Sequence, residues 1–383
     1  MASTDPLATL PAQFRHAGYT AEFLASRLGI RVPDDVGQLN HAPALERLRG
    51  DRSKAAGLTR LFFLEADENR LALDSATTQA LRRRGLVSLR GHSLRARLRI
   101  DPVGPHWLLS DRRFRAPDAS ALALPAGDPV YPPSSDSLLL RDAVVSTEGS
   151  TVLDLCTGSG IQALVASGRA DRVVAVDISS RAAALARLNA ALNGVTNVDV
   201  RSGDLYRPAA GERFDTIIAN PPFVPSPYRS GPAYHSGGPT GARVLQRIAR
   251  GLERALQTEG RFFAVSHLAL RRTEAVADVV RPWFRDFAGR TLALVVESGT
   301  AIDLAAAQSL FALADGLSAY AAEVKRWAAY LQGHRIREIV LLLLVAERTG
   351  RRDFDVVTAF QRTLPLPLSH PPRHHIEQWL TAR

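Results

Sequence analysis

The sequence predicts an α/β fold in which a doubly wound, mostly parallel sheet of seven strands follows a smaller N-terminal helical domain. Three observations predict it. From residue 151 on, short apolar strands alternate with helical patterns, as in sheets covered by helices on both faces. A glycine-rich turn follows the first of these strands. The first hundred residues differ, since they combine short helical patterns with one basic hairpin.

The strands of the predicted sheet are short apolar runs bounded by glycine or polar residues. They are Thr151–Leu155, Arg172–Asp177, Val198–Ser202, Phe214–Asn220, Gly260–Ser266, Thr291–Glu297 and Ile336–Val345. Helical periodicity separates them, for example over Ser179–Asn193, Gly241–Thr258 and Ala305–Leu331.

The N-terminal part reads as short helices followed by a hairpin. Helices are expected over Tyr19–Leu28, Pro43–Leu48, Lys54–Leu64 and Ser75–Arg83, the last with Ser75 as its N-cap. Near-alternating apolar and polar residues over Leu86–Ile100 predict a hairpin that turns at Gly91. We therefore expect a winged-helix-like domain over residues 1–115, a linker over about 115–133, and a second domain over residues 116–383.

The charge of the chain is concentrated near its start. The 383 residues carry 48 basic and 38 acidic side chains, and all the basic ones except Lys54 and Lys325 are arginine. Residues 1–100 hold 16 of the basic and 10 of the acidic groups, and residues 82–99 hold seven arginines and no acid. Such a hairpin could contact phosphates, or it could be a solvated basic surface.

Other features exclude several classes of protein. The single cysteine, Cys156, rules out an internal disulfide and a cysteine-based metal site, and we expect no metal. The longest apolar run, Ile339 to Ala346, is less than half of the roughly 20 residues that span a bilayer. The N-terminus lacks the pattern of a signal peptide. We expect a cytoplasmic protein with no membrane partner.

The turn after the first strand of the sheet, VLDLCTGSGIQ, carries Gly158 and Gly160. Glycines let the backbone approach a ligand closely, and the following helix N-terminus favours electronegative groups. Asp177 ends the second strand about 20 residues later, where an acid can bind both hydroxyls of a ribose. Asp204, after the third strand, could accept from the exocyclic amino group of an adenine. Position 163 is Ala, so the glycines alone do not identify the cofactor.

The fourth strand ends in Asn220, Pro221, Pro222 and Phe223. In an open α/β sheet this end of a strand faces the ligand crevice. Two successive prolines remove two backbone donors and force an extended turn. The Pro221 carbonyl and the Asn220 side chain would then be free to accept hydrogen bonds from a planar NH2 group, with Phe223 stacking on its face.

Together these segments resemble a known family. DLCTGSG, VDIS, SGDLY and NPPF are similar to motifs of the class I S-adenosylmethionine-dependent methyltransferases that act on planar amide or amine nitrogens. The HemK-like group, which methylates the glutamine side-chain amide of release factors and ribosomal proteins, is the nearest. Val130–Val144 resembles the segment before its glycine loop, and Gly237–Arg247 the glycine-rich helix start after its NPP turn. The resemblance covers about residues 130–300 and implies a Rossmann-like methyltransferase sheet.

Site residues follow from this resemblance, position by position. It implies that Asn220, Pro221, Pro222 and Phe223 hold the acceptor for direct transfer of a methyl group, without an evident general base. It implies S-adenosylmethionine as cofactor, with S-adenosylhomocysteine as product, bound by Ser137, Asp154, Cys156, Gly158, Gly160, Asp177, Ile178, Asp204, Leu205 and Asn220. Cys156 stands where most members have Gly, and Phe223 where Tyr is more usual.

The residues leave the acceptor open. A glutamine of a protein is expected first, and a base of RNA or DNA or a small specialised metabolite is the alternative. A winged-helix nucleic-acid-binding regulator that only senses the cofactor is a third reading, which an intact NPPF turn argues against. The N-terminal domain would recognise the substrate or form a homodimer.

Overall fold

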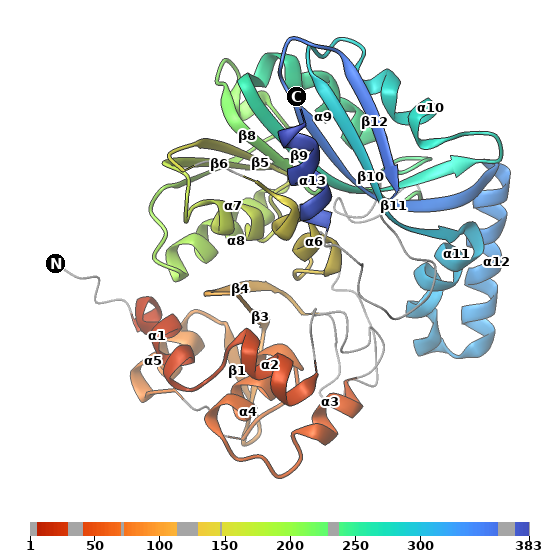
Figure 1. The fold of residues 1–383 in the computed structure, drawn as a ribbon. Coiled ribbons are helices and arrows are strands. Elements are labelled where there is room, and N and C mark those ends of the chain that lie inside the picture. Colours follow the sequence, from red (N-terminus) through yellow and green to blue (C-terminus); the bar gives the residue numbers. More distant parts are fainter. Residues whose placement is uncertain are drawn as a thin grey trace. The chain divides into compact units, whose positions relative to one another are not determined.

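The computed structural model describes residues 6–29, 41–69, 73–112, 129–145, 148–228, 237–358 and 372–382 (Figure 1). Most of the linker expected over 115–133 lies outside these ranges. The chain divides into two compact units. The N-terminal unit is Met1–Ser135 with Gly158–Leu164 and Arg181–Thr196, and the sheet unit is Asp136–Thr157, Val165–Ser180 and Asn197–Arg383.

Within the described residues, the sheet unit is built on one large sheet of eight strands in the order β12-β10-β11-β9-β8-β5-β6-β7. The strands are β5 (Thr151–Leu155), β6 (Arg172–Asp177), β7 (Val198–Ser202), β8 (Phe214–Ala219), β9 (Leu256–Arg271), β10 (Arg290–Thr300), β11 (Ile336–Glu347) and β12 (Asp353–Thr358). The neighbours from β7 to β9 pair in parallel, and β11 is antiparallel to both β9 and β10. All seven expected strands are confirmed, although β9 is longer than predicted.

The expected number of strands is wrong by one, because β12 was not foreseen. This strand lies at the edge of the sheet and pairs in parallel with β10. Its sequence, DFDVVT, lacks an apolar run. Val356 and Val357 are exposed, and only Phe354 packs against the core. An edge strand with so little burial has no strong hydrophobic pattern to find in the sequence.

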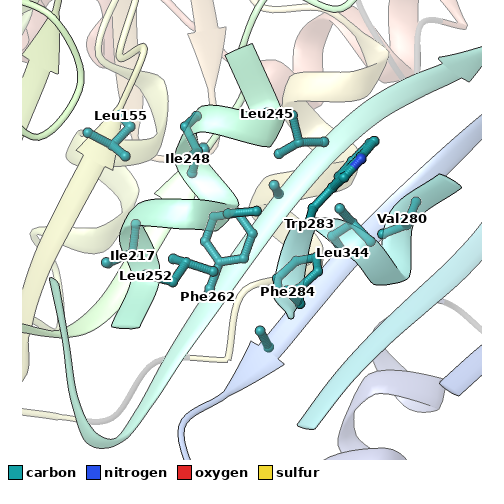
Figure 2. Packing of buried hydrophobic residues seen from close by; sticks show 14 of the residues in the cluster. Leu155, Ile217, Leu245, Ile248, Leu252, Phe262, Val280, Trp283, Phe284 and Leu344 are labelled. Carbon is teal, nitrogen blue, oxygen red and sulfur yellow. The ribbon is translucent and has the colours of Figure 1, made fainter. Parts of the chain in front are cut away.

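The main core of the sheet unit packs helices onto one face of the sheet (Figure 2). The helix α9 (Arg243–Ala255) contributes Leu245, Ile248 and Leu252, and the short helical turn after α10 (Val276–Val280) contributes Trp283 and Phe284. The strands contribute Leu155, Ile217, Phe262 and Leu344, among others. This packing holds the strands whose ends carry the predicted site.

A second cluster in the sheet unit involves a helical pair inserted between β10 and β11. The helices are α11 (Ala301–Ser309) and α12 (Leu317–Gly333), which divide the single helical segment expected over Ala305–Leu331. Trp327 and Leu331 of α12 are buried with Val224, and Phe223 packs against them. The inserted helices therefore support the residues just after the strand β8.

The other helices after residue 134 are α6 (Ser135–Ala143), α7 (Ile161–Ala166), α8 (Ser180–Leu192) and α13 (Pro372–Thr381). Most of α7 and nearly all of α8 belong to the N-terminal unit. None of the helices described is both long enough and apolar enough to cross a membrane.

In its described residues, the N-terminal unit contains short helices and two hairpins. Its elements are α1 (Leu10–His16), α2 (Ala21–Leu28), α3 (Ala42–Arg47), α4 (Lys54–Leu58), α5 (Ser75–Arg83), β1 (Val87–Arg90), β2 (Ser93–Ala96), β3 (Leu98–Val103) and β4 (His106–Asp111). A π-helical turn, Thr59–Phe63, continues α4. The N-cap of α5 is Asp74 and not Ser75, since the Asp74 carboxylate accepts a hydrogen bond from the Thr77 amide.

The predicted hairpin forms, but it is shorter than expected. The strands β1 and β2 pair antiparallel around Gly91, which has φ +60°. Residues from Leu98 on leave this hairpin, because β3 pairs with β4 in a second one. Asn189 of α8 belongs to the same unit and is fully buried, where its amide bonds both the N–H and the C=O of Leu109 on β4.

Replacing Gly251 by alanine should destabilise the sheet unit, although alanine is the better helix former. The added Cβ would lie 2.2 Å from Cε2 of Tyr206, whose hydroxyl donates to the Ile248 carbonyl. We expect chemical denaturation to show a loss of about 1–3 kcal/mol in the free energy of unfolding. The control is Gly333→Ala at the end of α12, where the added carbon meets no described atom within 4 Å. That change should be neutral or stabilising by up to about 1 kcal/mol, and equal effects of the two would contradict the packing argument.

Candidate active site

The predicted site residues of the sheet unit lie at the carboxyl ends of neighbouring parallel strands. Cys156 follows β5, Asp177 ends β6, Asp204 follows β7 and Asn220 follows β8. The strand β5 has β6 on one side and β8 on the other, so the strand order reverses at β5. The edge beyond the carboxyl ends at such a reversal is where open α/β sheets bind ligands.

The end of β5 is held by a buried carboxylate. Asp154 is fully buried, and its carboxylate accepts a hydrogen bond from Thr157 Oγ1 at 2.6 Å. The Thr157 amide donates to the Val176 carbonyl of β6 at 3.1 Å. These contacts fix the backbone at Cys156, which has φ +60°. Residues other than glycine seldom adopt this conformation.

The glycines that follow have the backbone that the turn requires. Gly158 and Gly160 have φ +55° and +89°. A Cβ at Gly160 would lie 3.2 Å from the Cβ of Ala186 on α8, so this position demands close packing. A Cβ at Gly158 would meet no described atom within 4 Å, which leaves room beside the backbone there.

Asp177 and Ile178 present a polar and an apolar group next to each other. The Asp177 carboxylate accepts from the Ser179 amide at 2.9 Å, and its carbonyl accepts from the Gly203 amide at 2.8 Å. Ile178 is 65% exposed, although it is a large apolar residue. A carboxylate suits the two hydroxyls of a ribose, and an exposed apolar side chain beside it suits the face of an adjoining flat ring.

Asp204 has a partner that was not predicted. Arg247 of α9 donates to the Asp204 carboxylate at 2.6 Å. Leu205 has φ +50°, and its side chain is buried in the core. Of these two residues, Asp204 therefore has its carboxylate in an ion pair, and Leu205 has its side chain in the core.

The Cys156 thiol interacts electrostatically with the charged residues at the ends of the neighbouring strands. Burial raises the pKa of this thiol well above its ordinary value. The charges of Asp177, Asp154 and Asp204 raise the pKa further, while Arg247 lowers it. The site is thus surrounded by carboxylates, which favours a cationic ligand.

Asn220 is oriented by α6. Its Nδ2 donates to Asp136 Oδ2 at 2.8 Å and lies 3.3 Å from Ser137 Oγ. An ionised carboxylate can only accept, so the nitrogen of the amide must be the atom that faces Asp136. Oδ1 of Asn220 is then directed away from Asp136.

The rest of the turn is tightly packed. The ring of Phe223 lies 4.7 Å from the ring of His267 on β9, tilted by 48°. Gly241 has φ +79°, and a Cβ there would lie 2.0 Å from the Phe223 carbonyl oxygen. The glycine-rich segment singled out from the sequence therefore lies directly against the NPPF turn.

Three residues of the site were missed by sequence reasoning. Asp136 directly precedes the predicted Ser137. Its place in the first turn of a helix is the feature of the sequence that could have identified it. Arg247 is the last residue of the glycine-rich segment Gly237–Arg247, but nothing in the sequence pairs it with Asp204. His267 is the one histidine in the strand β9, which is otherwise rich in apolar residues.

The Cys156 thiol should react slowly with iodoacetamide in the folded protein at pH 8. Its raised pKa keeps the thiolate fraction low. We expect alkylation to be at least about tenfold slower than in the denatured chain, measured by mass spectrometry. Asp177→Asn removes a charge that raises this pKa and should speed the reaction. Native alkylation at the denatured rate would contradict the described environment.

Two family models match the chain. Residues 134–284 match the methyltransferase small domain, and residues 16–97 match a domain of unknown function, DUF7059.

Curated relatives match part of the chain. A provisionally named protein N5-glutamine methyltransferase of Methanocaldococcus jannaschii is 34% identical over 137 residues, which are 34% of this chain and 68% of the relative. The release factor glutamine methyltransferase of Thermodesulfovibrio yellowstonii is 29% identical over 44% of this chain and 66% of its own length. The ribosomal protein uL3 glutamine methyltransferase of Burkholderia pseudomallei is 36% identical over 29% of this chain and 42% of its own length.

Among solved structures, a ribosomal protein L11 methylase from Lactobacillus delbrueckii subsp. bulgaricus is 29% identical, with a TM-score of 0.26 over 33% of this chain and 55% of its own. Given the match that covers 68% of a relative at 34% identity, the chain belongs to the class I S-adenosylmethionine-dependent methyltransferases, in the HemK-like family of protein glutamine methyltransferases.

Proposed function

We propose that this protein transfers a methyl group from S-adenosylmethionine to the side-chain amide nitrogen of a glutamine in a protein. The orientation of Asn220 is the observation that carries the proposal. With Nδ2 committed to Asp136, Oδ1 is the acceptor that an NH2 group requires. The names of the relatives, which act on release factor and on ribosomal protein uL3, support a protein substrate.

The described residues fit the cofactor. The carboxylates around Cys156 suit a sulfonium cation and the donor groups of an adenosine, and the exposed Ile178 suits the face of its base. The open position beside Gly158 lets a ligand approach the backbone. We assign the cofactor to Ser137, Asp154, Cys156, Gly158, Gly160, Asp177, Ile178, Asp204, Leu205 and Asn220.

The NPPF turn would hold the acceptor. Asn220 Oδ1 and the Pro221 carbonyl would accept the two hydrogens of the amide, and Phe223 would cover its face, with Pro222 keeping the turn extended. The cofactor supplies the electrophilic methyl group. Held in this way, the amide nitrogen would present its lone pair along one line, and its proton would leave through Asn220 or the Pro221 carbonyl to water.

We further propose that the residues before 116 form a winged-helix-like domain that recognises the protein substrate or forms a homodimer, in a cytoplasmic enzyme. The basic hairpin argues less for nucleic acid than its composition suggested. Of the seven arginines over residues 82–99, Arg99 lies on β3 outside the β1–β2 hairpin, where it is fully buried and bonds Asp101 at 2.8 Å. Arg95 is partly buried beside Asp67. These two arginines are not presented to a phosphate backbone.

Asn220→Ala should abolish most methyl transfer and leave cofactor binding nearly intact. Loss of orientation of the acceptor predicts a fall in kcat of about 10²-fold or more. The measurement is transfer of tritiated methyl to a glutamine-containing protein fraction, with cofactor affinity by calorimetry as the control. Full turnover by this variant would exclude the assigned role of the turn.

Asp177→Ala should weaken cofactor binding. Loss of a charged acceptor of ribose hydroxyls predicts a reduction in affinity of about tenfold or more. Asp199→Ala is the matched control, because this acid lies on the adjacent strand β7 and forms ion pairs with Arg172 and Arg201. Calorimetry that gives the same affinity for both variants would refute the ribose assignment.

A further inference from the structure

His267 lies beside the NPPF turn. The strand β9 pairs in parallel with β8 up to the pair Ala219 and Ala264. It then continues beyond the end of β8, so that His267 comes three residues after this last pair, opposite Leu341 of β11. His267 therefore lies alongside the NPPF turn, which follows the end of β8.

The imidazole ring of His267 contacts Phe223, the last residue of the NPPF turn. Its ring centroid is 4.7 Å from that of Phe223, within the range in which aromatic rings attract each other. Its Nδ1 is buried and has no hydrogen-bond partner in the described part of the chain. Since an unpaired buried nitrogen is costly, the interaction that we assign to this ring is its contact with Phe223.

The carboxylate of Asp136, which bonds Asn220 at the start of the turn, acts electrostatically on His267. Burial lowers the pKa of His267 from its ordinary value of 6.5, and the carboxylate of Asp136 on α6 raises it. The residues that face the ring from the turn and from β11, which are Phe223 and Leu341, carry no charge. Asp136 is the same carboxylate that accepts the Asn220 amide. Asp136 thus bonds Asn220, and its charge acts on the ring that packs against Phe223.

We propose that His267 is a positioning residue for the acceptor, and that it acts only as the neutral imidazole. This inference rests on the proposed function of the turn. The neutral ring supports Phe223 and leaves the Asp136 carboxylate to the Asn220 amide. A protonated ring would pair with Asp136 and compete with Asn220 for it, so that the amide of Asn220 would lose its fixed orientation.

The first test is the pH dependence of methyl transfer. In the wild-type protein the rate should fall below pH 6.5, about tenfold per pH unit once the ring is mostly protonated. His267→Phe keeps an aromatic ring beside Phe223 but cannot be protonated. This variant should transfer methyl with a kcat within about tenfold of wild type at pH 8 and lose the acidic fall. His267→Ala, without a ring, should lower kcat at pH 8 by at least about tenfold.

The matched control is His334→Phe. His334 also lies beside an aromatic ring, that of Tyr330 at 4.3 Å, but its Nδ1 bonds the Tyr330 carbonyl. This variant should keep the wild-type pH profile. An acidic fall that persists in His267→Phe would overturn the proposal. Loss of activity in His267→Phe at every pH, with folding and cofactor affinity intact, would also overturn it, because the imidazole would then be a proton acceptor.

The second test does not depend on activity. NMR titration of the His267 ring should give a pKa below 6.5 in the wild type and a still lower value in Asp136→Asn, since the carboxylate raises it. An unchanged pKa in that variant would exclude the coupling. If the wild-type protein transfers no methyl to glutamine, the proposed function fails, while the titration still decides whether Asp136 and His267 interact.

Discussion

The position of β5 between β6 and β8 is the constraint on which the rest of the site depends. This strand pairs in parallel with β6 on one side and β8 on the other. The carboxyl ends of these strands therefore meet at one edge, although Asp177 and Asn220 are more than forty residues apart in the chain. Burial of apolar side chains between the sheet and α9 keeps the strands in this arrangement.

A second constraint acts on the NPPF turn. An asparagine side chain has a donor and an acceptor of nearly the same shape, so its orientation is undetermined unless a neighbour distinguishes them. Asp136 does this, because a carboxylate only accepts. The inserted helices α11 and α12 add support, since Phe223 and Val224 pack with Trp327 and Leu331. The turn is thus held by polar contacts at one end and apolar contacts at the other.

The two parts of the protein differ in their distribution of charge. The basic surplus belongs mostly to the first hundred residues, yet some of its arginines are used internally, as Arg99 is with Asp101. In the sheet unit, carboxylates dominate the surroundings of Cys156, and Arg247 is paired with Asp204. Net charge is therefore a poor guide to the chemistry of this site, which depends on where a few acids lie.

The sequence by itself determined the strands of the sheet that are buried and the order of the motifs at their ends. Buried strands such as β5 and β6 have continuous apolar runs, and the glycine and Asn-Pro-Pro turns have chemical signatures of their own. It did not determine β12, whose exposed residues carry no such pattern. Only the tertiary structure placed Asp136 against Asn220, Arg247 against Asp204, and His267 against Phe223. These pairs join residues distant in the chain, and local periodicity contains no information about which side chains meet across a fold.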